Sequence, residues 1–338
     1  MGIFVHISSS RLKDMCYLDK YINNKVIQDG IEKSTEDKYR SLLNMFFDYM
    51  KEIKNTDNEL EILNAVTRLD MDDFRDYLLI EKHRAISTVN ELIVMVKSFN
   101  HYLLDREIIT NDFTKNMKQV KFNPKNEKIK APIIKDAMIE KDYKNLISAT
   151  YIKANGARNF EFNSARDRLI LSFMASTGTR IQETLSIRMD MIEKQDENTY
   201  FINVSEEDVK NDMNKKTPLV GKCLKYFKEY LEQRKKLKNI VDSKYLFLSA
   251  KGKVVNKQNV NDLINKYCGY ANINKKLSPH SFRHYFSAQG NAKGINPAII
   301  NIIAGWKPQS MQEKYAFEGL KNNREAQVEA CLKIQGCI

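Results

Sequence analysis

The chain has few of the residues that build disulfide frameworks, metal sites or membrane spans. Its five cysteines are an odd, widely scattered set without a Cys-x-x-Cys pair, and no histidines stand at spacings that would complete a metal site. No segment approaches the roughly 18 consecutive apolar residues that a transmembrane helix needs, and residues 1–10 lack a signal-peptide pattern. We therefore expect reduced thiols, no bound metal and a cytoplasmic protein without membrane contact.

Acidic residues are also in deficit. The chain has 55 Lys and Arg against 43 Asp and Glu, a formal net charge of +12 and a pI near 9.2. Such a positive field attracts phosphate backbones, which favours a nucleic-acid partner. A genome biased toward lysine, asparagine and isoleucine accounts for the same charge, so composition alone leaves both interpretations open. The length of 338 residues and the hydrophobic fraction of 42% predict two domains with separate cores.

Residues 11–118 carry helical periodicity and predict an all-α N-terminal domain of four or five helices. One apolar stripe follows Ser34 and Thr35, which are plausible N-cap residues, and a second follows Ser87 and Thr88. Residues 71–80 predict a shorter helix between them. The two stripes consist of Tyr39, Leu42, Leu43, Phe46, Phe47 and Met50, and of Val89, Leu92, Ile93, Val96, Phe99 and Leu103.

Residues 119–133 are rich in lysine, contain Pro124 and Pro132, and have few large apolar side chains. This composition predicts an extended basic linker between the domains. A solvated loop fits the composition as well. The position between two periodic segments favours a hinge that lies against phosphates.

Residues 134–338 predict a mixed α/β domain that is mostly helical, so the whole chain is expected to be mainly α. Helices are expected over residues 140–151, 165–176, 222–238, 256–270, 280–292 and 297–304, from 311 onward, and over 319–334. Residues 199–204 and 216–220 predict a small antiparallel sheet with Lys210 in its connecting turn. The helix at 165–176 breaks at Thr177, Gly178 and Thr179, and Arg180 opens the next helix.

Several basic and aromatic residues of this half suit chemistry on a phosphodiester. Arg180 and Arg283 are candidates to hold its two non-bridging oxygens, because planar guanidinium groups bind such oxygens bidentately. His280 stands three residues before Arg283, so both side chains project from one helix face. Taken singly, each arginine is more often a surface or salt-bridged residue, and His280 is more often an ordinary helix N-terminal residue.

Trp306 and Tyr315 follow in the last segment. Trp306 is the only tryptophan; such a residue is usually part of the core, yet its indole N–H can donate to a phosphate oxygen while the ring packs. Tyr315 is one of 16 tyrosines. A tyrosine hydroxyl is a weak nucleophile at neutral pH, so attack on phosphorus requires neighbouring cations.

The order of these residues resembles the tyrosine recombinase (phage integrase) family. The resemblance is specific from about residue 134 to 320 and general in the helical N-terminal half. It is carried by Thr177-Gly178-Thr179-Arg180 with Glu183, then Lys210, His280-Ser281-Phe282-Arg283, Gly305-Trp306 and Tyr315.

The resemblance implies a role for each of these residues. Tyr315 would form a 3′-phosphotyrosyl bond while Arg180 and Arg283 clamp the scissile phosphate. Lys210 would protonate the leaving 5′ oxygen; it is preferred to Lys215 and Lys216 because it precedes Pro218 by eight residues (218 − 210 = 8), the family's separation, although the turn lacks the usual glycine.

Three further residues would support this set. His280 would assist proton transfer or bind the phosphate. Glu183 would orient the basic cluster. Trp306 stands where many family members have histidine and others tryptophan, and an indole cannot relay a proton.

The implied function is site-specific DNA recombination without metal or nucleotide cofactor. Four protomers would assemble on two double-stranded DNA sites and pass through a Holliday junction, with the C-terminal segment contacting a neighbouring protomer and DNA-bending accessory proteins possible. The short stretch before Arg11 predicts no additional arm-binding domain. The target sequence, the outcome (integration, excision, inversion or multimer resolution) and the type of genetic element stay open.

Three rival functions use some of the same features. A type IB topoisomerase-like enzyme shares the tyrosine and the basic cluster but needs no partner site. A sequence-specific DNA-binding protein would occupy its site without cutting. A metal-dependent nuclease or transposase would use carboxylates, but these show no coherent ligand spacing.

Overall fold

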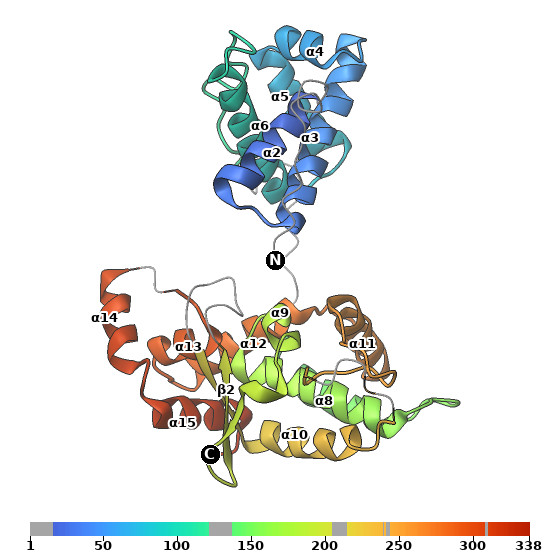
Figure 1. Cartoon of the computed structure of the whole chain (residues 1–338), viewed down its shortest axis with the longest axis vertical. Coiled ribbons are helices and arrows are strands. Elements are labelled where there is room, and N and C mark those ends of the chain that lie inside the picture. Colours follow the sequence, from blue (N-terminus) through green and yellow to red (C-terminus); the bar gives the residue numbers. More distant parts are fainter. Residues whose placement is uncertain (1–15, 122–136, 205–214, 239, 241–243, 308–309) are drawn as a thin grey trace. The chain divides into compact units, whose positions relative to one another are not determined.

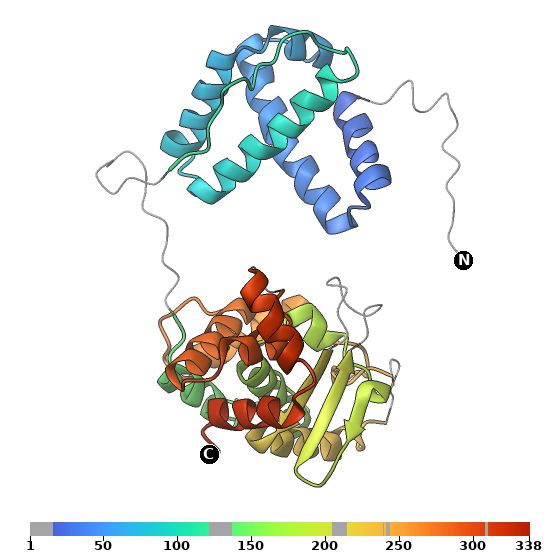
Figure 2. The ribbon, with the colours of Figure 1, turned by 90° about the vertical axis from the view of Figure 1, so that its left-hand side faces the viewer.

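The computed structural model describes residues 16–121, 137–204, 215–238, 240, 244–307 and 310–338. The chain divides into two compact units, residues 1–134 and residues 135–338; each is seen from two directions in Figures 1 and 2. Residues 122–133 of the predicted basic linker lie outside the described residues, as does Lys210.

The secondary structure in the described part of the first unit is all helical, and residues 105–121 form turns and irregular chain. Its elements are α2 (Tyr17–Asp29), α3 (Lys33–Lys54), α4 (Glu59–Ala65), α5 (Arg68–Asp76), the π-helical turn η1 (Tyr77–Glu81) and α6 (Ile86–Leu104). The structure buries all six apolar residues of the second predicted stripe and five of the first, while Tyr39 packs half-buried at the edge of the same core. Stacking of Phe46 on Phe113, with ring centroids 6.0 Å apart, ties α3 to the segment that follows α6.

Both predicted N-cap pairs in this unit were wrong, because each helix begins earlier. Ser34 and Thr35 lie inside the first turn of α3, where Lys33 pairs with Glu36 at 3.0 Å, and an acidic residue in that turn is favoured by the helix dipole. α6 begins at Ile86, which packs partly buried on the core. Packing and ion pairing therefore outweigh the capping preference of serine and threonine.

The second unit is built around α8 (Phe160–Thr177), which is buried along nearly its whole length and runs through the middle of the unit (Figure 1). The helices α10 (Gly221–Arg234) and α12 (Pro279–Ala292) pack against it. A helix surrounded in this way has apolar residues on all sides. The remaining helices are α7 (Glu140–Ala149), α9 (Ile181–Leu185), the 3-10 turn η2 (Met189–Met191), α11 (Lys257–Tyr270), α13 (Pro297–Ala304), α14 (Met311–Leu320) and α15 (Arg324–Gln335).

A three-stranded antiparallel sheet flanks this helical core, in the order β1-β2-β3. Its strands are β1 (Ile192–Lys194), β2 (Thr199–Val204) and β3 (Lys215–Val220). β2 confirms the predicted strand, β3 begins one residue earlier than predicted, and β1 was missed because it has only three residues. Pro218 is tolerated opposite Phe201 because β3 is an edge strand, where the missing N–H need not pair.

The predicted helix over residues 319–334 is two helices in the structure. α14 ends at Leu320, and Asn323 caps α15 by accepting a hydrogen bond from the backbone N–H of Ala326 at 3.0 Å. α15 packs on β3, α12 and α13 of its own unit and buries Gln327, Ala330, Cys331 and Ile334. A contact of this helix with a neighbouring protomer stays a prediction.

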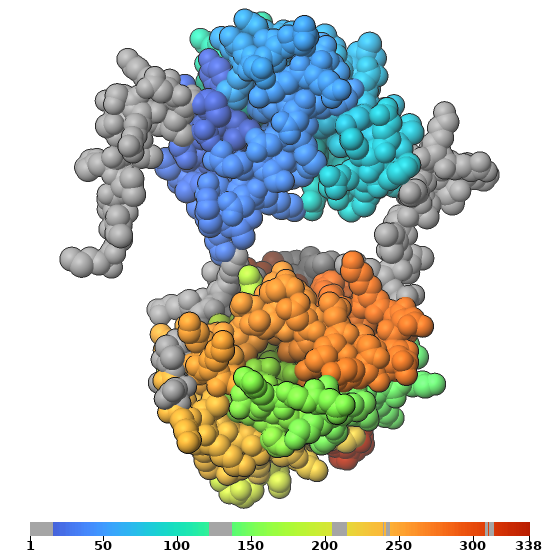
Figure 3. Space-filling view, turned by 90° about the vertical axis from the view of Figure 1, so that its right-hand side faces the viewer, coloured from blue at the N-terminus to red at the C-terminus, as the bar shows by residue number. Residues whose placement is uncertain are grey.

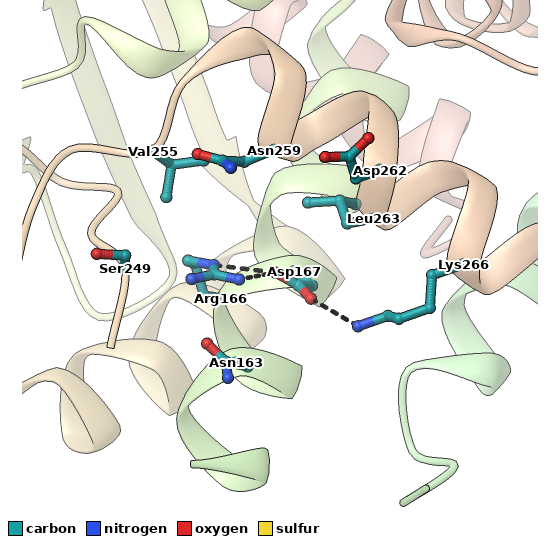
Figure 4. A pocket seen from close by; sticks show the side chains of 9 residues that line it. All are labelled: Asn163, Arg166, Asp167, Ser249, Val255, Asn259, Asp262, Leu263 and Lys266. Atoms are coloured by element: carbon teal, nitrogen blue, oxygen red, sulfur yellow. Dashed lines mark hydrogen bonds and ion pairs between the residues drawn. The ribbon is translucent and has the colours of Figure 1, made fainter. Parts of the chain in front are cut away.

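A buried carboxylate joins α8 to α11. Asp167, only 1% exposed, accepts hydrogen bonds from Arg166 at 2.6 and 2.9 Å and from the hydroxyl of Tyr267 at 2.8 Å, and pairs with Lys266 at 3.4 Å. Figure 4 shows Arg166, Asp167 and Lys266 in a pocket between the two helices. Figure 3 shows this face of the unit, where the orange surface of α11 borders the green surface at the start of α8. The network is internally paired and holds the core of the unit.

We predict that Asp167→Ala lowers the free energy of unfolding of this unit by about 3 kcal/mol, because it leaves the half-buried Arg166 without its anionic partner and the buried Tyr267 hydroxyl without its acceptor. Urea unfolding followed by tryptophan fluorescence reports this unit, since Trp306 is the only tryptophan. Asp262→Ala is the matched control: its exposed carboxylate accepts from Gln258, and its loss should cost less than about 0.5 kcal/mol. Equal effects of the two substitutions would contradict this assignment.

Candidate active site

The turn that ends α8 positions the first site residue. Gly178 adopts the left-handed conformation (φ 60°), and a Cβ at this position would lie only 2.9 Å from Cγ of Phe286, so the turn requires glycine. The hydroxyl of Thr179 lies 3.1 Å from that of Thr177 and 2.9 Å from that of Thr184. This buried chain of hydroxyl groups fixes the turn, and Arg180 then stands at the N-cap of α9.

Arg283 is the buried centre of the site. Its residue is 6% exposed, and Nη1 donates hydrogen bonds to the carbonyl oxygen of Gly178 at 2.5 Å and to that of Ala304 at 2.9 Å. Its guanidinium lies over the ring of Trp306, with 4.7 Å between the guanidinium carbon and the ring centroid. The buried Nη2 has no hydrogen-bond partner among the described residues. That donor is available to an anion.

Glu183 lies between two cations. Its Oε1 accepts from Nη1 of Arg180 at 2.7 Å, and its Oε2 lies 3.6 Å from Nζ of Lys215. Oε2 also accepts from the backbone N–H of Arg180 at 3.3 Å. The Arg180 side chain is 42% exposed, so this carboxylate anchors the arginine from one side.

The buried charges shift their pKa values. Burial lowers the pKa of Lys215 to about 8 against the opposing effect of Glu183, and Arg283 and Arg180 lower it further. Burial lowers the pKa of Arg283 to about 10, assisted by Arg180. Burial alone would raise the pKa of Glu183, but Lys215 and Arg180 outweigh it and hold that pKa below its usual value. The cluster therefore contains more positive charge than its single carboxylate balances.

Four predicted residues meet at one pocket, which is lined by Arg180, His280, Arg283 and Trp306. His280 is exposed near the start of α12, with its ring 4.3 Å from that of His284 between centroids. Trp306 is half-buried directly after Gly305, which ends α13 in the left-handed conformation. Residues separated by more than 120 positions in sequence thus converge as the motif order implies.

Tyr315 is not among the residues that line this pocket. It lies on α14 and is 73% exposed. Phe317, two residues on, is buried in the cluster that includes α13 and α15 and anchors the helix. The phenol is therefore presented to solvent from an anchored helix.

Other residues of the site were not foreseen from the sequence. Lys257 and Asn261 of α11 line the same pocket. Asn256 marks the start of α11 by capping it, but nothing in the local sequence indicates that α11 packs against α9 and reaches this pocket. Lys215, which its spacing from Pro218 disfavours as the proton donor, reaches the cluster from β3.

Within the described ranges, His, Cys, Asp and Glu side chains do not gather in threes that could hold a metal ion. Nor does any helix of the described part combine the length and the apolarity needed to cross a bilayer.

Comparison with known proteins identifies related chains. A family model described as the phage integrase family matches residues 137–318, more than half of the chain. The tyrosine recombinase XerD of Staphylococcus epidermidis (strain RP62A) is 25% identical over 299 residues, which cover 88% of this chain and 92% of the relative.

Solved structures share the fold. XerH recombinase bound to a palindromic difH substrate in a post-cleavage complex has a TM-score of 0.63 at 15% identity, with 96% of this chain and 84% of that chain covered. A lambda integrase tetramer bound to a Holliday junction has a TM-score of 0.60 at 15% identity, with 88% and 76% covered. The predicted fold class is thereby confirmed.

We predict that Gly178→Ala destabilises the second unit and distorts the pocket, because the added methyl group meets Phe286 and displaces the carbonyl that anchors Arg283. Overpacking should add about 1–3 kcal/mol to the cost of the left-handed backbone. Gly156→Ala is the control: it has a similar φ of +72° but nothing within 4 Å. Tryptophan fluorescence during urea unfolding measures both. Equal losses would show that backbone strain alone requires Gly178.

Proposed function

The chain belongs to the phage integrase family, the tyrosine recombinases, and we propose that it performs site-specific DNA recombination with Tyr315 as nucleophile and the cluster around Arg283 as phosphate site. Members of this family are enzymes that cleave and rejoin DNA, and the chain is such an enzyme. The assignment of individual residues rests on the geometry of the pocket.

One observation carries the assignment: Arg283, which lines the pocket, has a buried donor without an acceptor. Its Nη2 has no hydrogen-bond partner in the described part of the chain. Such a donor costs on the order of 1–3 kcal/mol. A phosphodiester supplies the missing acceptor and the missing negative charge, since its two non-bridging oxygens share one negative charge that increases during attack.

In the proposed reaction, Tyr315 gives its phenol proton to His280 or to solvent, Oη attacks the scissile phosphorus, and the bond from phosphorus to the 5′ oxygen breaks. Arg180 and Arg283 hold the non-bridging oxygens, and Lys210 gives a proton to the leaving 5′ oxygen. The 3′-phosphotyrosyl bond conserves the energy of the broken bond. A 5′ hydroxyl of the partner strand can therefore reverse the step without a nucleotide cofactor.

The remaining residues assist the two arginines. His280, exposed at the rim of the pocket, binds the phosphate or assists proton transfer. Trp306 packs on Arg283 and would donate a hydrogen bond from its indole N–H to a phosphate oxygen. Glu183 orients Arg180 through its 2.7 Å hydrogen bond. Because an indole cannot relay a proton, acid–base work falls to Lys210 and His280.

The exposure of Tyr315 has a mechanistic consequence. Its hydroxyl does not line the pocket, so attack requires DNA to occupy the pocket beside α14 or the helix to bring the phenol to the phosphate. Either event makes cleavage depend on bound DNA. Uncontrolled hydrolysis is thereby limited.

The proposed assembly follows the structural relatives. XerH is bound to difH substrate, and lambda integrase forms a tetramer on a Holliday junction. We extend both properties to this chain: four protomers on two double-stranded sites, in the cytoplasm. Residues 11–118 would bind the core site, residues 119–133 would follow the backbone, residues 134–338 would catalyse, and α15 would contact a neighbour. DNA-bending accessory proteins are compatible with this assembly.

Two other activities would use the same features, and experiments can distinguish them from recombination. A type IB topoisomerase-like enzyme would relax DNA without a specific site, and a non-cutting DNA-binding protein would form no covalent complex. The pocket supports cutting, because four residues of the recombinase motif line it together, and a protein that only binds does not need this set at a single phosphate. A metal-dependent nuclease would lose its activity in EDTA.

We predict that Tyr315→Phe abolishes the covalent protein–DNA complex while leaving DNA binding nearly unchanged, because only the attacking oxygen is removed. The assay uses a nicked suicide DNA substrate, drawn first from sequence flanking the gene, in EDTA, with denaturing electrophoresis and a parallel binding measurement. Tyr151→Phe is the control, since Tyr151 is also exposed but stands far from the motif residues in sequence.

A covalent band that persists in Tyr315→Phe would assign the nucleophile elsewhere. Loss of DNA binding in this variant would make Tyr315 a structural residue. Site binding without a covalent band in the unaltered protein would favour the non-cutting DNA-binding protein.

A further inference from the structure

Lys215 lies beside Glu183 and Gly305, next to the proposed phosphate site, and takes no part in the proposed reaction. It is the first residue of β3 and pairs with Val204 at the end of β2. Its side chain is 9% exposed and extends beside Gly305: Cδ and Nζ each lie 3.4 Å from the place that a Cβ on Gly305 would occupy. Backbone pairing at one end and a close backbone contact along the stem therefore fix where the ammonium stands.

The carboxylate of Glu183 connects the ammonium of Lys215 to Arg180. Nζ lies 3.6 Å from Oε2 of Glu183, and Oε1 of the same carboxylate accepts from Arg180 at 2.7 Å. Charged or titratable groups face Lys215 from three elements: Glu183 and Arg180 from α9, Arg283 from α12 and Cys331 from α15. Glu183 is the anion among these groups. Its one negative charge is therefore shared by two cations, Lys215 and Arg180.

Nζ of Lys215 is badly placed to be the proton donor. A general acid must come within hydrogen-bond reach of the leaving oxygen. Nζ is buried 3.6 Å from Oε2 of Glu183, and Lys215 is not among the residues that line the pocket. Lys215 therefore acts on the site through Glu183.

Burial of this lysine is costly, which speaks against a purely structural role. Burial lowers its pKa from the ordinary value of 10.5 to about 8 in spite of Glu183. A lowered pKa of a base means that folding disfavours its ammonium form. The cost is therefore present below about pH 8 and is relieved as the pH rises toward 10.5. An apolar side chain would avoid it.

We propose that Lys215 is a positioning residue for Arg180: its ammonium holds one oxygen of Glu183 so that the other oxygen orients Arg180 without neutralising it. The inference rests on the proposed function, in which Arg180 binds the scissile phosphate. Removal of Lys215 leaves the whole charge of Glu183 to Arg180 and frees its carboxylate to rotate. Arg180 then offers less charge, in a less defined place, to the transition state.

The test measures single-turnover cleavage of the nicked suicide substrate and, separately, DNA affinity. Lys215→Met should lower the cleavage rate about tenfold or more while DNA affinity stays within about twofold, because the lost interaction acts in the transition state. Lys215→Arg should recover most of the rate. Lys216→Met is the matched control: its neighbouring side chain is 40% exposed and pairs with Glu193 at 3.2 Å, so the rate should not change.

A double-mutant cycle with Glu183→Gln tests the route through the carboxylate. If Lys215 acts through Glu183, adding Lys215→Met to the Glu183→Gln protein should lower its cleavage rate by less than about threefold. If the double variant is slowed by the product of the two single reductions in rate, the positioning role is wrong. It is also wrong if Lys215→Met cleaves at the unaltered rate. Lys215→Met should also unfold at no lower urea concentration at pH 7, and a loss of stability with no rescue by arginine would make the lysine structural.

Two further variants separate this inference from the proposed function. Arg180→Ala and Tyr315→Phe should both lose cleavage whether or not Lys215 matters. If they retain it, the proposed site itself is wrong. If they lose it while Lys215→Met does not, only the role of Lys215 fails.

Discussion

The guanidinium of Arg283 joins the ends of two helices to a third. From α12 it donates to the carbonyl of Gly178, at the end of α8, and to that of Ala304, at the end of α13. Carbonyl groups at helix C-termini lack intrahelical partners and carry partial negative charge, so a buried cation satisfies both needs. The same contacts place Arg180, which follows Gly178, and Trp306, which follows Gly305, around one pocket. Packing of the catalytic unit and assembly of its site therefore depend on one side chain.

The second constraint is electrostatic. Arg180, Arg283 and Lys215 gather around a single carboxylate, Glu183, and burial lowers the pKa of Lys215 to about 8 and that of Arg283 to about 10. An isolated fold gains nothing from such an excess of buried positive charge. It becomes favourable when a phosphodiester enters, because donors that already stand in place need no reorganisation during the reaction. The cluster of cations thus lowers the stability of the protein without DNA and stabilises an anion that develops in the reaction.

Much of this organisation was predictable from local sequence. Pro297 and Gly305 bracket α13 as a helix start and stop, and the β-branched and aromatic residues of β2 predict its bounds. Arg180, His280, Arg283 and Trp306, which the motif order grouped, line one pocket, and their roles stay predictions. The helix starts at Lys33 and Ile86, the place of Lys215 beside Gly305, and the approach of Lys257 to the pocket were not predictable, because each depends on contacts between residues distant in sequence. Lys210 lies outside the described residues, so its role stays a prediction.

The central claim is that these cations exist to neutralise the scissile phosphate. The most direct measurement compares cleavage of two suicide substrates on a confirmed site, one with the natural phosphate and one with a methylphosphonate, in which a methyl group replaces a charged non-bridging oxygen. The account predicts that Arg283→Ala cleaves the phosphate substrate much more slowly than the unaltered protein does. On the neutral methylphosphonate substrate, the two proteins should cleave at more nearly equal rates. An equal defect on both substrates would contradict it, because Arg283 would then matter only for the fold.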